Sequence, residues 1–240
     1  MATIAGNLQA VKSRISAAAT RAGRRPDSVH LIAVSKTHPA ALLAQAHAAG
    51  QTAFGENYVQ EAVEKMDALA RLLGPEAARG LEWHLIGPLQ SNKTRVVAER
   101  FAWVHTVDRE KIARRLSEQR PADLAPLKVL IQVNVSGEAT KSGVVPGDVA
   151  PLARTLAVMP RIELRGLMGI PEPSDDAAVQ RVRFRALREL YERLKRDGLA
   201  LDTLSMGMSG DMEVAIEEGA TLVRVGTAIF GARESVKSAA

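Results

Sequence analysis

The chain has 240 residues, no cysteine, and 32 lysine and arginine residues against 27 aspartate and glutamate residues, which gives a net charge of +5. Hydrophobic residues make up 46% of the chain and charged residues 25%, a composition that excludes disordered, collagen-like and coiled-coil proteins. The absence of cysteine excludes disulfides, zinc–thiolate sites and thiol nucleophiles, and it suits a reducing, cytoplasmic location.

The positive charge is concentrated at the start of the sequence. Residues 1–30 hold the single acid Asp27 against five basic residues, which are Lys12, Arg14, Arg21, Arg24 and Arg25. Only 3% of the residues are aromatic, so few side chains could stack on bases, and a solvated basic helix is favoured over a nucleic-acid surface. No apolar run approaches the roughly 18 residues that a membrane span needs. We therefore expect neither a nucleic acid nor a membrane as partner.

Helical and strand-like segments alternate along the chain. Residues 4–22 place Leu8, Val11 and Ile15 at helical spacing and predict an amphipathic helix. Eight short apolar or β-branched runs then predict strands at 31–34, 52–54, 83–86, 103–107, 129–135, 162–168, 201–206 and 222–225. Helices are predicted between them, at 39–49, 57–73, 92–100, 109–119, 147–158, 177–196 and 211–217.

This alternation is typical of parallel βαβ units, which could form an open, doubly wound sheet or a closed barrel. The count of eight strands favours the barrel, and no change in composition marks a domain boundary. The sequence therefore predicts a single α/β domain over residues 1–240, a (β/α)8 TIM-type barrel with an extra N-terminal helix. Because the chain ends soon after the eighth strand, we expect the N-terminal helix to cover the place of the last outer helix.

Polar residues and glycines stand where the predicted strands end, which is the end of such a barrel that carries its chemistry. After the seventh and eighth strands, Gly207, Ser209, Gly210, Gly226 and Thr227 offer backbone N–H groups and hydroxyls. Such groups suit a phosphate dianion, and this position matches the usual phosphate site of (β/α)8 barrels. The two loops together favour phosphate binding over ordinary turns.

Lys36 directly follows the first predicted strand. An amine at the mouth of a barrel, facing a phosphate group, can form a Schiff base with a sugar phosphate or with pyridoxal phosphate. The residues alone leave this choice open.

Several segments, taken together, resemble one family. They are AVSKTHP, FGENYVQE, WHLIGPLQSNK, KSG, RGLMGI, MGMSGDME and VRVGTAIFGAR, and they span nearly the whole chain in order. The chain is similar in them to the pyridoxal phosphate homeostasis proteins, the YggS and PROSC group. The resemblance implies a barrel of the alanine-racemase type without its second domain. It also implies a protein that binds pyridoxal 5′-phosphate (PLP) and takes part in intracellular vitamin B6 homeostasis, as a store or a carrier to apo-enzymes.

The resemblance assigns three residues to the cofactor ring. Lys36 in SKT would form the internal aldimine, and Asn57 in FGEN would lie near the ring and its phenolic oxygen. Arg224 in VRVG would face the pyridine nitrogen. A permanent positive charge at that nitrogen disfavours its protonation, which makes the ring a weaker electron sink.

The resemblance assigns the phosphate to Ser209, Gly226 and Thr227. Lys141, in TKSG, matches a basic position near the cofactor mouth that is associated with cofactor exchange. The family often has a second lysine two places after the first, and here that residue is His38.

Three classes of function remain: a non-catalytic PLP carrier, a PLP-dependent amino-acid racemase, and an aldolase in which Lys36 attacks a sugar phosphate. Racemases of this fold use a tyrosine from a second domain across a dimer, whereas this chain holds only Tyr58 and Tyr191. We therefore expect a carrier, and a monomer. We expect no metal, because the five histidines form no ligand pair at helical spacing, and we interpret His84 and His105 as core residues.

Overall fold

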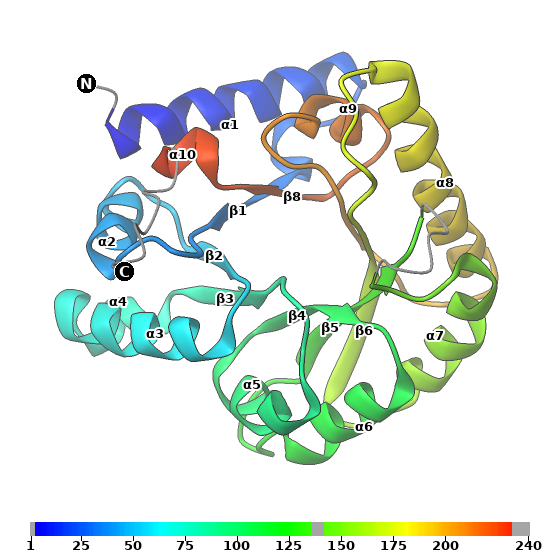
Figure 1. Ribbon diagram of the computed structural model, residues 1–240, viewed down its shortest axis with the longest axis horizontal. Helices are drawn as coiled ribbons and strands as arrows, with labels where there is room; N and C mark the ends of the chain where they lie inside the picture. Colours follow the sequence, from blue (N-terminus) through cyan, green and yellow to red (C-terminus); the bar gives the residue numbers. More distant parts are fainter. Residues whose placement is uncertain (1–2, 136–141, 232–240) are drawn as a thin grey trace, which may run out of the picture.

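The computed structural model describes residues 3–135 and 142–231, in which eight parallel strands close into a barrel (Figure 1). Each strand pairs with the next one in sequence, and β8 pairs with β1. The strands are β1 (His30–Val34), β2 (Ala53–Glu56), β3 (Glu82–Leu85), β4 (Trp103–Val107), β5 (Leu127–Val133), β6 (Ile162–Gly169), β7 (Thr203–Ser205) and β8 (Leu222–Val225). The closure confirms the predicted barrel, because an open sheet would leave two strands with one neighbour each.

Every predicted helix is present, with shifts of one or two residues at most ends. The α-helices are α1 (Ile4–Arg21), α2 (Ala40–Ala48), α3 (Val59–Leu73), α4 (Pro75–Arg79), α5 (Thr94–Arg100), α6 (Glu110–Gln119), α7 (Val149–Ala157), α8 (Ala177–Arg196), α9 (Met212–Glu217) and α10 (Thr227–Phe230). Short 3₁₀ turns are η1 (Pro26–Ser28), η2 (Ser91–Lys93) and η3 (Pro146–Asp148). The sequence did not predict α4 and α10, because segments of four or five residues are too short to show a helical period.

Successive side chains of each strand pack on opposite sides of the barrel wall. Phe54 of β2 belongs to the main hydrophobic core between the strands and the surrounding helices. Its neighbour Gly55 points to the inside, where a Cβ atom would lie 2.8 Å from Ile32 and 3.1 Å from Ile86. A separate cluster of Trp103, Leu130 and Met168 fills part of the barrel interior. The barrel is therefore packed rather than hollow.

Helix α1 lies beside α9 and α10, at the place where the outer helix after β8 would stand (Figure 1). This confirms the expected covering role. Arg14 and Arg21 form ion pairs with Glu213 and Glu217 of α9. Two of the five N-terminal basic residues are therefore paired with acidic residues of α9, rather than only solvated as the sequence suggested.

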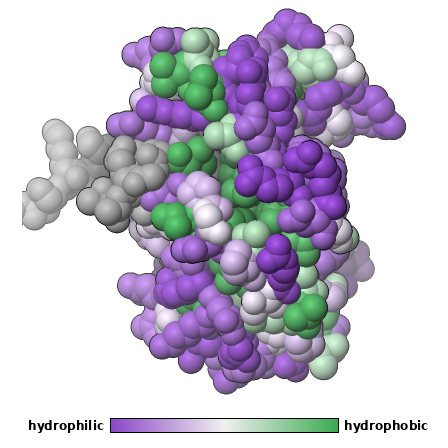
Figure 2. Space-filling view, turned by 90° about the vertical axis from the view of Figure 1, so that its right-hand side faces the viewer, coloured by the Kyte–Doolittle hydropathy of each residue, from purple (hydrophilic) through white to green (hydrophobic). Residues whose placement is uncertain are grey.

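The long helices carry many charged residues, and no helix within the described residues could cross a bilayer. Figure 2 shows that the face carrying α8 is mostly hydrophilic, with hydrophobic residues scattered over it.

Candidate functional site

All six residues predicted to bind a cofactor line one pocket of about 270 Å³ at the C-terminal mouth of the barrel. They are Lys36, Asn57, Ser209, Arg224, Gly226 and Thr227. Apart from Arg224 within β8, they stand just after β1, β2, β7 and β8, so the closure of the barrel brings together residues as far apart in the chain as Lys36 and Thr227. The pocket walls also include Ile86, Ile170 and Met208, which the sequence analysis missed because their apolar side chains have no chemical signature.

A buried ion pair supports the loop that carries Lys36. The Nζ atom of Lys65, on α3, lies 2.8 Å from the carboxylate of Glu56 at the end of β2, and it donates to the carbonyl oxygen of Ser35. Ser35 Oγ donates to the same Glu56 oxygen at 2.6 Å. Burial raises the pKa of Glu56, although Lys65 and the Ser35 hydroxyl oppose this effect. The residue before Lys36 is thus held through both its backbone and its side chain.

The residue after Lys36 is held as well. Thr37 has a φ of 66°, a left-handed conformation that a β-branched residue rarely adopts. Its backbone N–H donates to the Glu61 carboxylate, which also pairs with Lys65 at 2.6 Å. One short network therefore fixes the backbone on both sides of Lys36.

Asn57 is placed by a close backbone contact with Gly87. A Cβ atom on Gly87 would lie 2.2 Å from the Asn57 carbonyl oxygen and 2.6 Å from its Cα atom. Thr106 of β4 donates to the Gly87 carbonyl oxygen at 2.7 Å and fixes this loop from the other side. The Asn57 Oδ1 atom is buried and has no hydrogen-bond partner among the described residues. A buried amide oxygen in a pocket wall suits a polar ligand.

Substitution of Gly87 by alanine should lower the free energy of unfolding by about 1–3 kcal/mol, because the new methyl group would overlap the Asn57 backbone. Gly147→Ala is the matched control, since a Cβ atom there meets no atom within 4 Å, and it should change stability by less than about 0.5 kcal/mol. Urea unfolding of both variants measures the difference. Equal midpoints would contradict the close contact.

The loop after β7 is shaped by Gly207 and Asp211. Gly207 has a φ of 94°, and a Cβ atom there would lie 2.6 Å from the Ala215 Cβ atom. The Met208 N–H donates to the Asp211 carboxylate at 2.6 Å. Arg14 of α1 donates to the Ser209 carbonyl oxygen at 3.3 Å. The loop is therefore held from its own helix and from the N-terminal helix.

Arg224 enters the pocket from inside the barrel. It is 3% exposed and donates to Ser205 Oγ at 2.7 Å and to the Gly169 carbonyl oxygen at 3.1 Å. Burial lowers its pKa to about 10, so the guanidinium stays charged at neutral pH. The pocket therefore carries a fixed positive charge at its base.

The remaining predicted residues lie in varied places. His38 lines the pocket, and its ring lies 5.0 Å from that of Phe230. Lys141 lies outside the described residues. Tyr58 is 58% exposed, whereas Tyr191 is buried in α8 and donates to the Leu201 carbonyl oxygen. Neither tyrosine is among the described residues that line this pocket.

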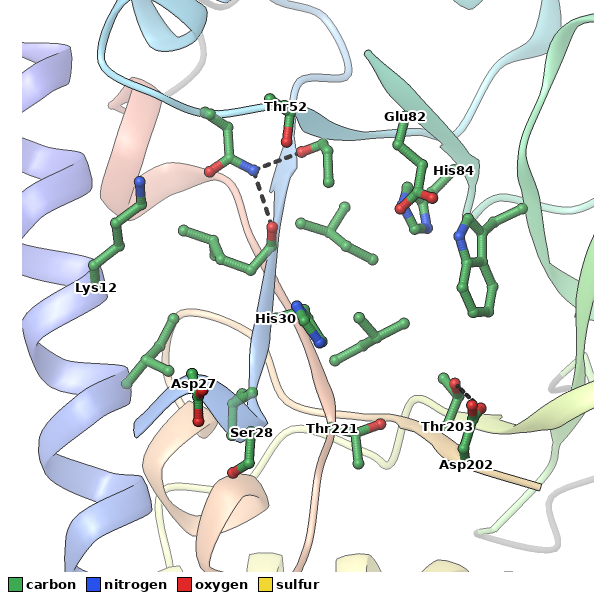
Figure 3. A pocket seen from close by; sticks show the side chains of 18 of the residues that line it. Lys12, Asp27, Ser28, His30, Thr52, Glu82, His84, Asp202, Thr203 and Thr221 are labelled. Atoms are coloured by element: carbon green, nitrogen blue, oxygen red, sulfur yellow. Dashed lines mark hydrogen bonds and ion pairs between the residues drawn. The ribbon is translucent and has the colours of Figure 1, made fainter. Parts of the chain in front are cut away.

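A larger cavity of about 740 Å³ opens at the opposite, N-terminal mouth (Figure 3). Charged residues of both signs line it, among them Lys12, Asp27, Glu82, Lys128 and Asp202. The side chains of Glu82 and His84 lie next to each other on one wall (Figure 3). The sequence analysis did not predict this cavity, because chemistry in such barrels is expected at the other mouth.

Within residues 3–135 and 142–231, no three histidine, aspartate or glutamate side chains form a group that could hold a metal ion. His84 and His105 are fully buried and hydrogen-bonded to each other, which confirms their interpretation as core residues.

Comparison with known proteins gives consistent matches. The family described as alanine racemase, N-terminal domain, matches residues 6–234. The pyridoxal phosphate homeostasis protein of Pseudomonas aeruginosa is 58% identical over 234 residues, covering 98% of this chain and 97% of that protein. The protein of the same name from Escherichia coli K12 is 53% identical over 237 residues, covering 99% and 100%. Among solved structures, PipY of Synechococcus elongatus PCC7942 with PLP bound is 38% identical, with a TM-score of 0.82, covering 95% of this chain and 100% of that one.

Proposed function

Because the chain belongs to the family of pyridoxal phosphate homeostasis proteins, we propose that it binds PLP at the C-terminal mouth of its barrel and serves intracellular vitamin B6 homeostasis as a store or carrier. The observation that carries this proposal is the convergence of an amine, a buried amide, a buried guanidinium and two glycine- and hydroxyl-bearing loops on one pocket of about 270 Å³. The PLP-bound structure of the relative PipY supports it.

The residues present fit the cofactor. When bound, PLP supplies an aldehyde that can form a Schiff base with a lysine amine. Lys36, whose backbone is fixed on both sides, would provide that amine, and the Asn57 amide, whose Oδ1 atom is buried, would lie beside the ring. The Arg224 guanidinium, which stays charged at neutral pH, would face the pyridine nitrogen as a hydrogen-bond donor.

The phosphate would lie between the loops after β7 and β8. Ser209 and Thr227 would provide hydroxyl donors, and Gly226 lets the loop after β8 pack closely against β1, since a Cβ atom there would lie 3.0 Å from the Val34 carbonyl oxygen. Hydroxyl and backbone N–H donors are the groups that bind a phosphate dianion.

We infer that the protein holds PLP without turning over amino acids. The racemase alternative requires an acid or base on the ring face opposite the lysine. Tyr191 of α8 is buried and donates to the carbonyl oxygen of Leu201, beyond the end of that helix, and Tyr58 is mostly exposed. The charged Arg224 disfavours a protonated pyridine ring, which counts against transaminase-like chemistry but does not exclude a racemase. The names of the relatives, homeostasis proteins rather than enzymes, support the same conclusion.

The test is turnover by the PLP-loaded protein across a panel of L-amino acids, with D-enantiomer formation followed by chiral chromatography. The carrier proposal expects no conversion above the rate of free PLP, together with transfer of PLP that restores activity to an added PLP-dependent apo-enzyme. Conversion of any amino acid with a rate typical of enzymes, about 1 s⁻¹ or more, would favour the racemase.

We propose further that residues 1–240 act as one PLP-binding domain, that the protein works as a monomer, and that its macromolecular partners are PLP-dependent apo-enzymes. Size-exclusion chromatography with light scattering tests the monomer directly, and a dimer mass would contradict it.

A further inference from the structure

Arg224 and four further polar side chains form a continuous chain of hydrogen bonds through the inside of the barrel. Arg224 Nη1 lies 2.7 Å from Ser205 Oγ, and Ser205 Oγ lies 3.0 Å from His105 Nδ1. His105 Nε2 lies 3.0 Å from His84 Nδ1, and His84 Nε2 lies 3.0 Å from the carboxylate of Glu82. We call these five residues the through-barrel chain.

The through-barrel chain crosses the interior from one mouth to the other. His84 and His105 belong to the adjacent strands β3 and β4, whereas Ser205 and Arg224 belong to β7 and β8. Because β4 and β7 are not neighbours in the closed barrel and both side chains are fully buried, the bond between them passes through the interior. Arg224 ends the chain in the PLP pocket, and Glu82, 40% exposed, ends it in the cavity at the N-terminal mouth.

The two ends fix the direction of every hydrogen bond between them. Arginine only donates, and an ionised carboxylate only accepts. The hydrogen bond from His84 lowers the pKa of Glu82 to about 2, so this carboxylate is ionised at neutral pH. Burial lowers the pKa of both histidines, that of His105 further because the charge of Arg224 lies nearby, so each ring carries one proton.

With one proton on each imidazole ring, only one placement of the protons gives every hydrogen bond of the through-barrel chain a donor and an acceptor. His84 must donate from Nε2 to Glu82, so its Nδ1 accepts from His105 Nε2. The His105 Nδ1 then accepts the hydroxyl proton of Ser205, whose oxygen accepts from Arg224. Both histidines are therefore Nε2–H tautomers, and all four bonds point from Arg224 towards Glu82.

The through-barrel chain does not conduct a proton. Moving one from Arg224 to Glu82 would take it from a group with a pKa of about 10 to one with a pKa of about 2. A gap of about eight pH units leaves a negligible population of the transferred state. The through-barrel chain can instead fix the orientation of its side chains, because each hydrogen bond restrains the side chains that it joins.

We propose that Glu82, His84, His105 and Ser205 are positioning residues that hold the Arg224 guanidinium towards the cofactor from the opposite mouth of the barrel. The positioning role rests on the proposed PLP site. The histidine tautomers that it requires depend only on the residues of the through-barrel chain and can be tested without PLP. A carboxylate in the N-terminal cavity thus sets the direction of a donor in the C-terminal pocket.

The first test is 15N NMR of histidine-labelled protein without PLP, with His84→Gln and His105→Gln used to assign the resonances. The proposal expects both rings to be neutral Nε2–H tautomers between pH 6 and 8, with Glu82, Lys128 and Arg224 as the charged groups that face them. In Glu82→Gln the end of the chain can donate as well as accept, so the Nδ1–H tautomer should appear as a second population. A protonated ring, or an Nδ1–H tautomer in the unsubstituted protein, would overturn the proposal.

The second test measures PLP binding and the visible absorption band of bound PLP. Ser205→Ala should raise the Kd for PLP about tenfold and shift the band, and Ser205→Thr, which keeps the hydroxyl, should restore both. Glu82→Gln should shift the band in the same direction, whereas Glu163→Gln, a carboxylate of β6 outside the chain, should not. Unchanged binding and an unchanged band in both Ser205→Ala and Glu82→Gln would overturn the positioning role. Failure of the unsubstituted protein to bind PLP would instead contradict the proposed function.

Discussion

Lys36→Ala should abolish covalent retention of PLP. In the unsubstituted protein, borohydride reduction should add the mass of one pyridoxyl group to the peptide that contains Lys36, and no such addition should occur in the variant. The visible band of the PLP-loaded protein should disappear in parallel. Without the covalent bond, the hydrogen bonds of the pocket remain, and we expect the apparent Kd to rise by at least about a hundredfold.

The matched control is Lys111→Ala, which removes an exposed lysine from α6 and should keep both the band and the pyridoxyl addition. A reduced adduct at a different lysine, with an unmodified Lys36, would show that the amine has been assigned to the wrong residue. An adduct formed only with a sugar phosphate would favour the aldolase alternative.

Lys65→Met should destabilise the protein by about 3–5 kcal/mol, because it leaves the Glu56 carboxylate buried without its cation. Lys65 is 7% exposed and Glu56 is fully buried, so water does not replace the lost ammonium group. Chemical unfolding at pH 7.5 measures the loss. The comparison is Arg114→Met, which breaks an exposed pair with Glu110 on α6 and should cost less than about 0.5 kcal/mol.

The size of this loss should depend on pH in a defined direction. Burial already raises the pKa of Glu56, and removal of Lys65 raises it further. A carboxyl group whose pKa is higher in the folded state favours folding when protonated, so the difference between the variant and the unsubstituted protein should shrink as the pH falls through that folded-state pKa. Lys65→Met combined with Glu56→Gln should recover most of the stability at neutral pH, because no charge remains buried. A loss that is independent of pH would contradict the ionised pair.

The barrel and the pocket residues were predictable for the same reason. Eight alternating segments favour a closed parallel barrel over an open sheet, and in a closed parallel barrel the residues that follow the strands meet at one mouth. Lys36 and Thr227 could therefore be placed in one pocket although they lie far apart in the sequence.

The network of hydrogen bonds and ion pairs around Lys36 was not predictable. It depends on the rotation of helices against strands and on distances inside the barrel, rather than on the order of the segments in the chain. Lys65 lies in the middle of a helix with acids around it, a pattern that usually faces solvent. Only the rotation of α3 against β2 turns it towards Glu56. The bond between His105 and Ser205 likewise depends on the inner width of the barrel, which leaves two side chains from non-adjacent strands 3.0 Å apart.

The docking of α1 has a consequence for biosynthesis. Asn7 donates to the carbonyl oxygen of Ile229, 222 residues later, and Arg14 contacts Glu213 and the Ser209 carbonyl, about 200 residues later. Helix α1 is therefore synthesised about 200 residues before its partners, and closing so long a loop costs entropy that only complete docking repays. A nascent chain that carries α1 lacks the Ser209 loop and the strand of Arg224 until β8 has been made. The proposed PLP pocket can then form only after Thr227 has been made, and not on a shorter nascent chain.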